Sequence, residues 1–369
     1  MSKRIKTIIA VTILIIVAIV ITIIPTSYYI ESPGTAVTIE PIMSIEGVEN
    51  DTNGEYMLTT VQSMRGTPLM LFLSLFDDYS DIYSEEEMIG DIENYDTFLN
   101  IQQYMMDSSK QTAVEAAYNL AGYPVEREYL GVYVSQVIPE SNFYGQLQPG
   151  DVVTTVNGEQ FETAQDFIDK VSSLEVGESI DITYLRDDMA HTASGELILV
   201  ESTGLPGIGI GVTDYSTIAM DPEVEIDTGA IGGPSAGFMF SLQIYTLLVD
   251  QDLPAGKSIA GTGTIDSEGN VGRIGGIHKK VVAADNEGAE IFFAPDDEIT
   301  DEMREYDPEI QTNYEEAKAA ADDIGTQMEI VPVKTLEDAI NYLKSINTAQ
   351  ETENNLSLFS CNYNLDYVS

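Results

Sequence analysis

Residues 232–237 read Gly-Gly-Pro-Ser-Ala-Gly and open an apolar segment with a helical pattern. The serine of this stretch, Ser235, is predicted to stand at a helix N-terminus, where backbone N–H groups point outward and the dipole favours an anion. An oxyanion forms at such a position during acyl transfer, and small neighbouring residues let a substrate backbone approach closely. The stretch is therefore a candidate site for a nucleophilic serine in an α/β region.

A serine is a weak nucleophile and needs a neighbouring base. The chain has two histidines, and only His278 lies near the second glycine-rich segment, Ile274-Gly-Gly-Ile-His-Lys-Lys280. A lysine serves as the base when burial lowers its pKa from about 10.4 to near the working pH. Lys280 stands just inside a predicted helix, and the apolar run Val-Val-Ala-Ala follows it. Each segment alone also fits a structural turn or a solvated charge, so the prediction depends on both occurring together.

The two segments together resemble the proteolytic domain of Lon-type proteases, with its Pro-Ser-Ala-Gly nucleophile motif and its Gly-Gly-x-x-x-Lys base motif. The resemblance implies that Ser235 is the nucleophile and that Lys280, not Lys279, is the base. It also implies that Thr262, in the run Gly-Thr-Gly, orients the lysine ammonium by hydrogen bonding. The resemblance thus predicts a serine protease with a Ser–Lys dyad.

Four further positions bear on this resemblance. Gly233 and Pro234 belong to the nucleophile motif and are expected to support it. The acid often found three residues before the serine is Gly232 here, and the acid that often follows the Thr-Gly pair is Thr264. Neither departure removes the dyad, but both are expected to change the pKa of the lysine or the conformation of the resting site.

Residues 126–200 resemble a PDZ domain of the type associated with bacterial proteases. The resemblance rests on the order of the elements and on a Leu-x-x-Gly-Asp signature followed by Asn157-Gly158, a pair typical of a tight hairpin turn. In such domains a peptide C-terminus adds as a strand, and backbone N–H groups hold its carboxylate. The resemblance implies that Leu130, Gly131 and Val132 bind the peptide beside a helix. Alternatively, the apolar side chains of this run only fill the core.

Residues 8–24 are apolar and uncharged, and Lys3, Arg4 and Lys6 precede them. At 1.5 Å per residue the run spans about 26 Å, short but adequate for a hydrocarbon core of about 30 Å. The basic flank should stay in the cytoplasm, so the rest of the chain emerges outside the cell. A cleaved signal peptide is the alternative, but its apolar region is usually shorter and ends in a small-x-small site. We predict an uncleaved single-pass anchor in the cell membrane.

Acidic residues dominate the composition, with 62 Asp and Glu against 16 Lys and Arg. This balance argues against nucleic acid as a partner, because phosphate binding needs clustered Lys and Arg. The acids are spread along the chain, which favours a solvated acidic surface; an acidic cleft that attracts basic peptides is the alternative. The single cysteine, Cys361, excludes a disulfide within the chain, and the two histidines do not form a His-Glu-x-x-His zinc motif.

No cofactor, metal ion or ATP is expected to take part in the chemistry. Gly256-Lys257-Ser258 looks like the end of a phosphate-binding loop, but Gln251 stands where its first glycine is required. The glycine-rich run 207–212 lacks the dinucleotide fingerprint. No ATPase domain is recognisable in the sequence, so the expected enzyme resembles Lon without its ATP-driven unfolding domain.

The expected fold class is α+β or mixed. The α/β region is predicted to start with a strand near Ile208–Val212 and to end with a helix over Leu336–Ile346, which a Thr335-x-x-Asp338 capping box would open. Five segments are expected: a cytoplasmic tail and transmembrane anchor (1–30), an extracytoplasmic β/helical region packing with the protease domain (31–125), a β-sandwich-like PDZ domain with helices (126–200), the α/β Lon-type domain (201–346) and a polar, loosely ordered tail (347–369).

Anchor, PDZ module and protease region together resemble the membrane-bound, PDZ-containing Lon-like proteases of Gram-positive bacteria. The resemblance implies an ATP-independent serine endopeptidase at the outer face of the cell membrane. Its expected partners are peptides, or small membrane or secreted proteins, that reach it by diffusion, while the PDZ module captures them or gates access. The alternative is a catalytically silent PDZ scaffold that binds C-terminal peptides at the membrane, and a cleaved anchor would give a freely secreted protease.

Overall fold

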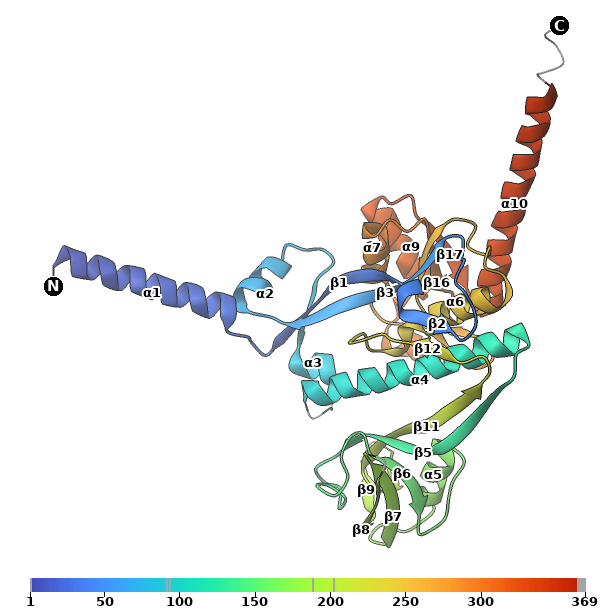
Figure 1. The fold of residues 1–369 in the computed structure, drawn as a ribbon. Coiled ribbons are helices and arrows are strands. Elements are labelled where there is room, and N and C mark those ends of the chain that lie inside the picture. Colours follow the sequence, from blue (N-terminus) through green and yellow to red (C-terminus); the bar gives the residue numbers. More distant parts are fainter. Residues whose placement is uncertain (1, 91, 93, 188, 202, 364–369) are drawn as a thin grey trace.

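The computed structural model of the chain describes residues 2–90, 92, 94–187, 189–201 and 203–363, with side chains described up to residue 349. Figure 1 shows two folded bodies with a long helix, α4 (Tyr95–Ala121), between them. The first helix, α1 (Lys3–Ile23), projects from one side, and the last, α10 (Leu336–Tyr363), projects from another. Most of the predicted tail 347–369, with Cys361, lies outside the described side chains.

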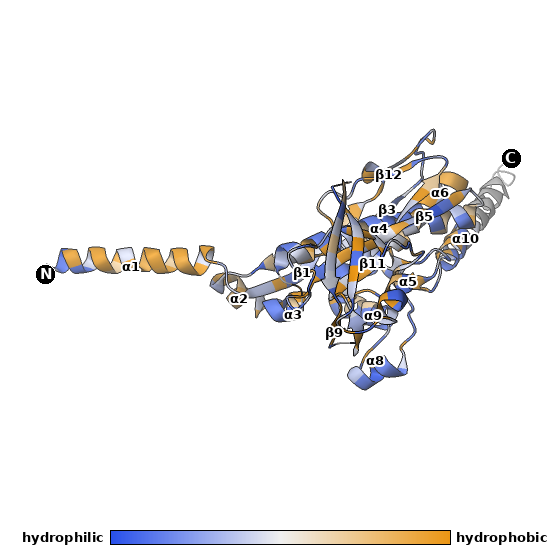
Figure 2. Ribbon diagram, turned by 90° about the horizontal axis from the view of Figure 1, so that it is seen from below, coloured by the Kyte–Doolittle hydropathy of each residue, from blue (hydrophilic) through white to orange (hydrophobic). Residues whose placement is uncertain are grey.

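The helix α1 is apolar along nearly its whole length. Ser2 is its N-cap, since the Ser2 hydroxyl accepts the Ile5 N–H, and none of its side chains is buried. Within the described residues it is the one helix long and apolar enough to cross a membrane, with a mean hydropathy of 2.8. Figure 2 shows this apolar helix standing apart from the folded bodies. The predicted N-terminal apolar helix is confirmed, whereas its sidedness and its retention remain predictions.

The larger body is built on a six-stranded sheet. In order across the sheet, its strands are β17 (Glu329–Val333), β16 (Ile291–Pro295), β13 (Ser258–Gly261), β3 (Glu55–Arg65), β1 (Tyr28–Thr38) and β4 (Asp81–Ser84). The first four run parallel, and β1 is antiparallel to both β3 and β4. The N-terminal region therefore supplies half of this sheet, whereas the sequence predicted only that it packs with the protease domain.

Helices cover both faces of this sheet. Alternate residues of a strand point to opposite faces, so Phe293 joins the core beneath α4 and α6, while Phe292 joins the core beneath α7 and α9. Every residue of β16 is buried, as is typical of a parallel strand covered on both sides. The bounds of these three further helices are Gly237–Val249 for α6, Ile277–Asn286 for α7 and Asn313–Ile324 for α9.

The helix α10 begins at the predicted residue and continues further than predicted. Its capping box is present: the Thr335 N–H donates to Asp338 Oδ2 over 2.9 Å, and the Asp338 N–H donates to Thr335 Oγ1 over 3.1 Å. The helix was expected to end at Ile346, but its backbone runs to Tyr363.

The smaller elements of this body are η1 (Glu40–Ile42), β2 (Met43–Ile45), α2 (Pro68–Ser74), α3 (Glu85–Ile89), β12 (Val224–Ile226), η2 (Pro234–Ala236), β14 (Thr264–Ile265), β15 (Val271–Gly272) and α8 (Asp301–Tyr306).

The smaller body is a five-stranded antiparallel sheet with one helix, α5 (Ala164–Ser172). Asn157 and Gly158 both have positive φ, 51° and 79°, and form the expected tight turn after β6. Asp151 is fully buried and pairs with Arg186 over 2.7 Å, which compensates its buried charge. The strands in order are β11 (Ile210–Met220), β5 (Val125–Val137), β6 (Val152–Val156), β7 (Ser179–Arg186) and β8 (Met189–Glu196), with β9 (Ile198–Val200) and β10 (Leu205–Gly207) as a separate pair.

The pairing of β11 differs from the sequence-based expectation. The strand predicted near Ile208–Val212 was assigned to the α/β region, but it lies in the sheet of the smaller body and pairs with β5. As a result β5 is an interior strand: Val132 pairs with Asp214 of β11 on one side and with Val153 of β6 on the other. An added peptide strand has no free edge on β5, and the peptide-binding role of Leu130, Gly131 and Val132 remains a prediction.

Candidate active site

Ser235 lies in the short 3-10 turn η2, directly before the buried helix α6. Gly233 enters this turn with a φ of 87°, a conformation that favours glycine, and Pro234 supplies the fixed φ that suits a first helical position. The backbone carbonyl of Ser235 accepts two hydrogen bonds, from the Gly263 N–H at 2.8 Å and from Thr262 Oγ1 at 3.0 Å. The serine is thereby held between the turn and the loop that follows β13.

The helix α4 holds the other side of this turn. The Gly233 N–H donates to the Gln102 carbonyl over 2.7 Å, and Ser109 Oγ donates to the Pro234 carbonyl over 2.9 Å. A side chain at Gly232 would place its Cβ 2.9 Å from Cβ of Gln102 and 3.2 Å from the Gln102 backbone carbon. The acid that the Lon resemblance implies at position 232 is therefore excluded by the close approach of α4.

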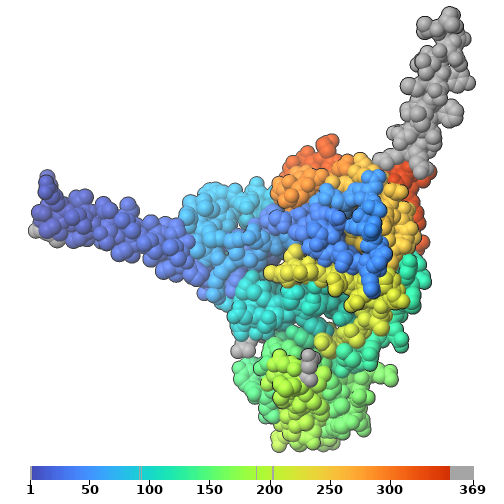
Figure 3. All heavy atoms as spheres, in the orientation of Figure 1, coloured from blue at the N-terminus to red at the C-terminus, as the bar shows by residue number. Residues whose placement is uncertain are grey.

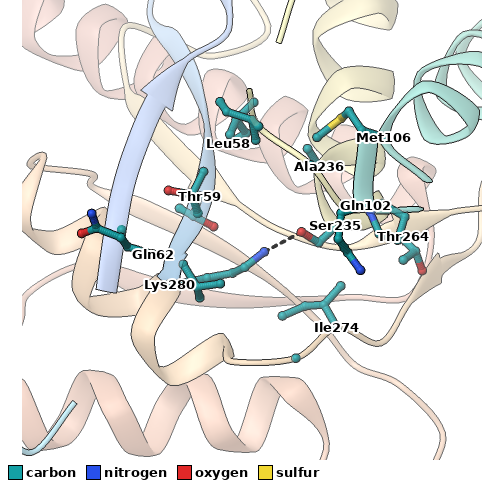
Figure 4. Close-up of a pocket in the computed structure, with 18 of the residues that line it drawn as sticks. Leu58, Thr59, Gln62, Gln102, Met106, Ser235, Ala236, Thr264, Ile274 and Lys280 are labelled. Carbon is teal, nitrogen blue, oxygen red and sulfur yellow. Dashed lines mark hydrogen bonds between the residues drawn. The ribbon is translucent and has the colours of Figure 1, made fainter. Parts of the chain in front are cut away.

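Lys280 reaches Ser235 from the first turn of α7. Its Nζ lies 2.7 Å from Ser235 Oγ and 2.9 Å from Thr262 Oγ1, as Figure 4 shows for the first contact. The Thr262 hydroxyl donates its proton to the Ser235 carbonyl, so its oxygen is left to accept a hydrogen bond from the amine. Five predicted residues, Ser235, Lys280, Thr262, Gly233 and Pro234, thus meet at one place.

Burial sets the charge of Lys280. Only 3% of the residue is exposed, and this burial lowers the pKa of its amine to about 7, against a smaller opposing effect of the Glu31 carboxylate. Its hydrogen-bond partners are two neutral hydroxyls and not carboxylates. A neutral amine 2.7 Å from a hydroxyl can accept its proton, so near neutral pH this geometry suits general-base chemistry.

The adjacent Lys279 has a different environment. Its Nζ lies 2.7 Å from Glu31 Oε1 of β1 and 2.6 Å from Asp81 Oδ2 of β4. Burial lowers the pKa of Lys279, but the hydrogen bonds that its ammonium donates to Asp81 and Glu31 outweigh this effect and raise the pKa above its ordinary value. Lys279 is therefore a structural cation that fastens α7 to the edge of the sheet, in agreement with the choice of Lys280 as the base.

An open cleft of about 710 Å³ lies beside Ser235 and Lys280. Among the described residues that line it there is no Asp or Glu, which argues against the alternative of an acidic cleft at this site. Sequence reasoning missed the contribution of β3 and α4, whose positions no motif indicates. The lining from these elements is Leu58, Thr59, Thr60, Val61, Gln62, Gln102 and Met106, with Gly34 and Thr35 from β1, Thr264 from β14 and Arg273 from the residues directly after β15.

The helix α4 also contacts the smaller body. Tyr104 stacks on Tyr133 of β5 with 3.7 Å between the ring centroids, and its hydroxyl donates to the Asp214 carbonyl of β11. Gln102 and Ser109, which hold the serine turn, lie within two turns of Tyr104 on the same helix. One helix therefore connects the candidate active site to the sheet of the smaller body.

Two families match the chain. Residues 112–197 match the PDZ domain family, and residues 208–343 match the Lon protease (S16) C-terminal proteolytic domain. The chain thus carries a PDZ domain and a Lon-type proteolytic domain in a mixed α/β structure behind an apolar N-terminal helix, which confirms the predicted fold class.

Several known proteins are similar to parts of the chain. The chain is 31% identical to the Lon protease of Rickettsia typhi over 112 residues, covering 30% of this chain and 14% of that protein. It is 26% identical to the Lon protease of Rickettsia bellii over 136 residues, covering 36% and 15%. A crystal structure of the PDZ domain of an SdrC-like protein from Listeria monocytogenes is 35% identical, covers 23% of this chain and 90% of that chain, and has a TM-score of 0.22. The chain therefore spans about a seventh of the length of these Lon proteases.

Proposed function

We propose that the chain is a membrane-anchored serine endopeptidase in which Ser235 is the nucleophile and Lys280 its general base. The observation that supports this most strongly is the 2.7 Å contact between Ser235 Oγ and a buried lysine whose other hydrogen-bond partner is the neutral hydroxyl of Thr262. The match to the Lon proteolytic domain supports a serine peptidase at the coarser level.

The proposed reaction begins with neutral Lys280. Its amine takes the proton of Ser235 Oγ while the oxygen forms a bond to the scissile carbonyl carbon, whose π electrons move onto the carbonyl oxygen. The resulting ammonium gives this proton to the departing amine as the C–N bond breaks, which leaves an acyl-enzyme. Water then attacks with Lys280 again as base, and the serine is released together with a carboxylic acid.

Thr262 and the serine turn have proposed supporting roles. Thr262 positions the Lys280 amine, because its hydroxyl proton is already donated to the Ser235 carbonyl and its oxygen faces Nζ. The N–H groups of the turn that opens α6 are the proposed donors to the oxyanion, since a helix N-terminus stabilises negative charge. Gly233 and Pro234 keep this turn in shape.

The proposed location is the outer face of the cell membrane. The basic residues in the first turn of α1 favour a cytoplasmic N-terminus, which leaves both folded bodies outside. Ser235 keeps partial exposure in an open cleft, so short or unfolded segments can reach it without an ATP-driven motor. We therefore propose ATP-independent cleavage of peptides, or of small membrane or secreted proteins.

The PDZ domain is proposed to capture a peptide along β11 instead of β5. The strand β11 is the edge strand of its sheet, and α5 lies beside it, with the Ala164 N–H donating to Asp214 Oδ1 over 2.6 Å. A peptide added to this edge would lie near Asp214, to which Tyr104 of α4 is bonded. Binding there is in a position to influence the serine turn through α4.

Hydrolysis of an unfolded protein and of a peptide set by the full chain in detergent, without ATP, tests this proposal. We expect cleavage by the wild type and loss of cleavage in Ser235→Ala and Lys280→Ala. Ser241→Ala, on the same helix, and Lys257→Ala, at the surface, are matched controls that should retain activity. Equal activity in all five proteins, or none in a folded wild type, would contradict the proposal and favour a silent PDZ scaffold.

A further inference from the structure

The short helix α2 and the turn after it present a largely exposed apolar surface beside α1. Leu69, Phe72, Leu73 and Phe76 are 37%, 57%, 56% and 74% exposed, and Leu75 is 70% exposed. Leu69, Phe72 and Leu73 follow an i, i+3, i+4 spacing, which places them on one face of the helix, and Leu75 and Phe76 continue the apolar run in the turn that ends it. Outside α1, no other eight-residue stretch of described side chains exposes more than two large hydrophobic residues.

This face is fixed close to the end of α1. The Thr26 N–H and hydroxyl both donate to the Gly66 carbonyl over 2.8 Å, and the Gly66 N–H donates to the Tyr28 carbonyl over 2.8 Å. Thr26 comes three residues after the last residue of α1, and Gly66 comes two residues before the first residue of α2. Figures 1 and 3 show α2 as the part of the folded body that lies next to α1.

The other face of α2 attaches it to the sheet. Leu71 points back toward Gly66, where a side chain would meet its Cδ2 at 2.8 Å, and Thr67 caps the helix by accepting the Met70 N–H. The helix therefore cannot turn its apolar face inward without losing these contacts. The segment 67–80 has no Lys or Arg, so its attraction to a surface must be apolar and not electrostatic.

We propose that the exposed face of α2 inserts into the outer surface of the bilayer that α1 spans, as a second membrane contact beside the anchor. A lipid surface fits this face because α1 brings it to the membrane boundary and because single exposed hydrophobic residues are common but a continuous patch marks an interaction site. Asp77 and Asp78, which follow directly, remain in water.

The second contact restricts the height and orientation of the proposed catalytic cleft relative to the membrane surface. The strand β1 runs from Tyr28, at the membrane contact, to Thr35, which lines the cleft, a distance of about 23 Å at about 3.3 Å per residue. If the cleft cleaves peptides as proposed above, it favours segments that leave the membrane and extend at least that far. Proteins tethered to the same membrane are then its substrate class.

Tryptophan placement tests the membrane contact, because the chain contains no tryptophan. Phe72→Trp and Phe76→Trp are made in the full chain and reconstituted in phosphatidylcholine vesicles with and without brominated acyl chains. We expect a blue-shifted emission that loses most of its intensity in brominated vesicles and that high salt does not restore. Ile13→Trp in α1 is the positive control, and Tyr306→Trp, at a position that is 95% exposed, is the solvent control.

Three results would overturn the proposal. Solvent-like emission at both positions would show a face in water, and blue-shifted but unquenched emission would show a face covered by protein. An unquenched Ile13→Trp would remove the anchor on which the inference depends. None of these readouts uses Ser235, so they are distinguishable from a failure of the proposed protease activity.

Discussion

Lys279 and Lys280 are neighbours on one helix, and both are buried, yet their environments are opposite. Lys279 lies between two carboxylates, which raise its pKa despite burial. Lys280 lies between two hydroxyls, and burial lowers its pKa to about 7. The comparison teaches that burial alone does not leave a lysine amine unprotonated near neutral pH. Its nearest hydrogen-bond partners must also be uncharged.

The two lysines are also coupled through Glu31. This carboxylate raises the pKa of Lys280, in opposition to the larger effect of burial, and it is paired with Lys279. By neutralising Glu31, Lys279 limits the negative potential that Lys280 experiences. The predictions below separate the two roles.

The largest expected effect comes from Lys280→Arg. Guanidinium keeps the positive charge but does not lose its proton in the working pH range, so it cannot act as the base. We expect a fall in kcat/KM of about 10⁴-fold, comparable to loss of a member of a serine-protease catalytic unit. Lys279→Arg is the matched control and should stay within about tenfold of the wild type, because arginine can still pair with Glu31 and Asp81. Peptide hydrolysis rates measure both, and an active Lys280→Arg would contradict the account.

Lys279→Met is expected to affect stability and pH dependence together. It leaves Glu31 without its buried partner, which should lower the free energy of unfolding by about 3 kcal/mol. The unpaired carboxylate favours the ammonium form of Lys280, so its pKa rises and the pH at half-maximal kcat/KM moves upward. Denaturant unfolding and a pH–rate profile measure the two effects.

A double variant distinguishes this cause from general damage. Glu31→Gln added to Lys279→Met removes the unpaired Glu31 charge, the one that acts on Lys280, and should bring the pH midpoint back to the wild-type value or below it. A midpoint that is the same in all three proteins would show that Glu31 does not tune Lys280.

Lys280→Met is expected to stabilise the fold in a pH-dependent way. The pKa of Lys280 is about 7 in the folded chain and about 10.4 in an unfolded one, so the unfolded state binds more protons between these values. Burial of Lys280 therefore lowers the free energy of unfolding by its full amount below pH 7, and this destabilisation disappears as the pH rises above 10.4. The variant should exceed the wild type by about 4 to 5 kcal/mol at pH 6, with the gap closing toward pH 10. Thermal or denaturant unfolding across pH tests this, and a gap that does not change with pH would contradict it.

Thr262→Val has the smallest expected effect. It removes the hydroxyl that accepts from Lys280 Nζ while keeping the volume, so the amine is positioned less well. We expect kcat to fall by about 10- to 100-fold with KM nearly unchanged, since the group acts on the base and not on substrate binding. Thr262→Ser keeps the hydroxyl and should recover most of the activity. Equal kcat in Thr262→Val and wild type would assign Thr262 a packing role only.

Much of the proposed dyad could be read from the sequence because its geometry is local to two motifs. Gly233 and Pro234 shape the turn that contains Ser235, and the apolar residues after Lys280 indicate that this lysine is buried. Their meeting could be expected only through the family resemblance, because no spacing rule connects the two segments in space.

What the sequence could not supply are contacts made by distant strands. Glu31 and Asp81 reach Lys279 through the pairing of β1 with β4, which hydrophobic patterns do not specify. The same limit applies to Leu130, Gly131 and Val132: the pattern shows a strand, but not that β11 pairs with its edge. A polar composition likewise did not reveal that the helix begun at Leu336 continues to Tyr363.

The central claim, a serine activated by a lysine with a lowered pKa, is tested most directly by the pH dependence of Ser235 modification. The full chain is exposed to a serine-reactive fluorophosphonate, and intact mass gives the rate of adduct formation across pH 5–10 for wild type, Lys279→Met and Lys280→Ala. The account predicts one adduct on the wild type with a half-maximal rate near pH 7, a higher midpoint in Lys279→Met and no adduct in Lys280→Ala. Labelling that persists in Lys280→Ala, or a rate that still rises steeply at pH 10, would contradict it.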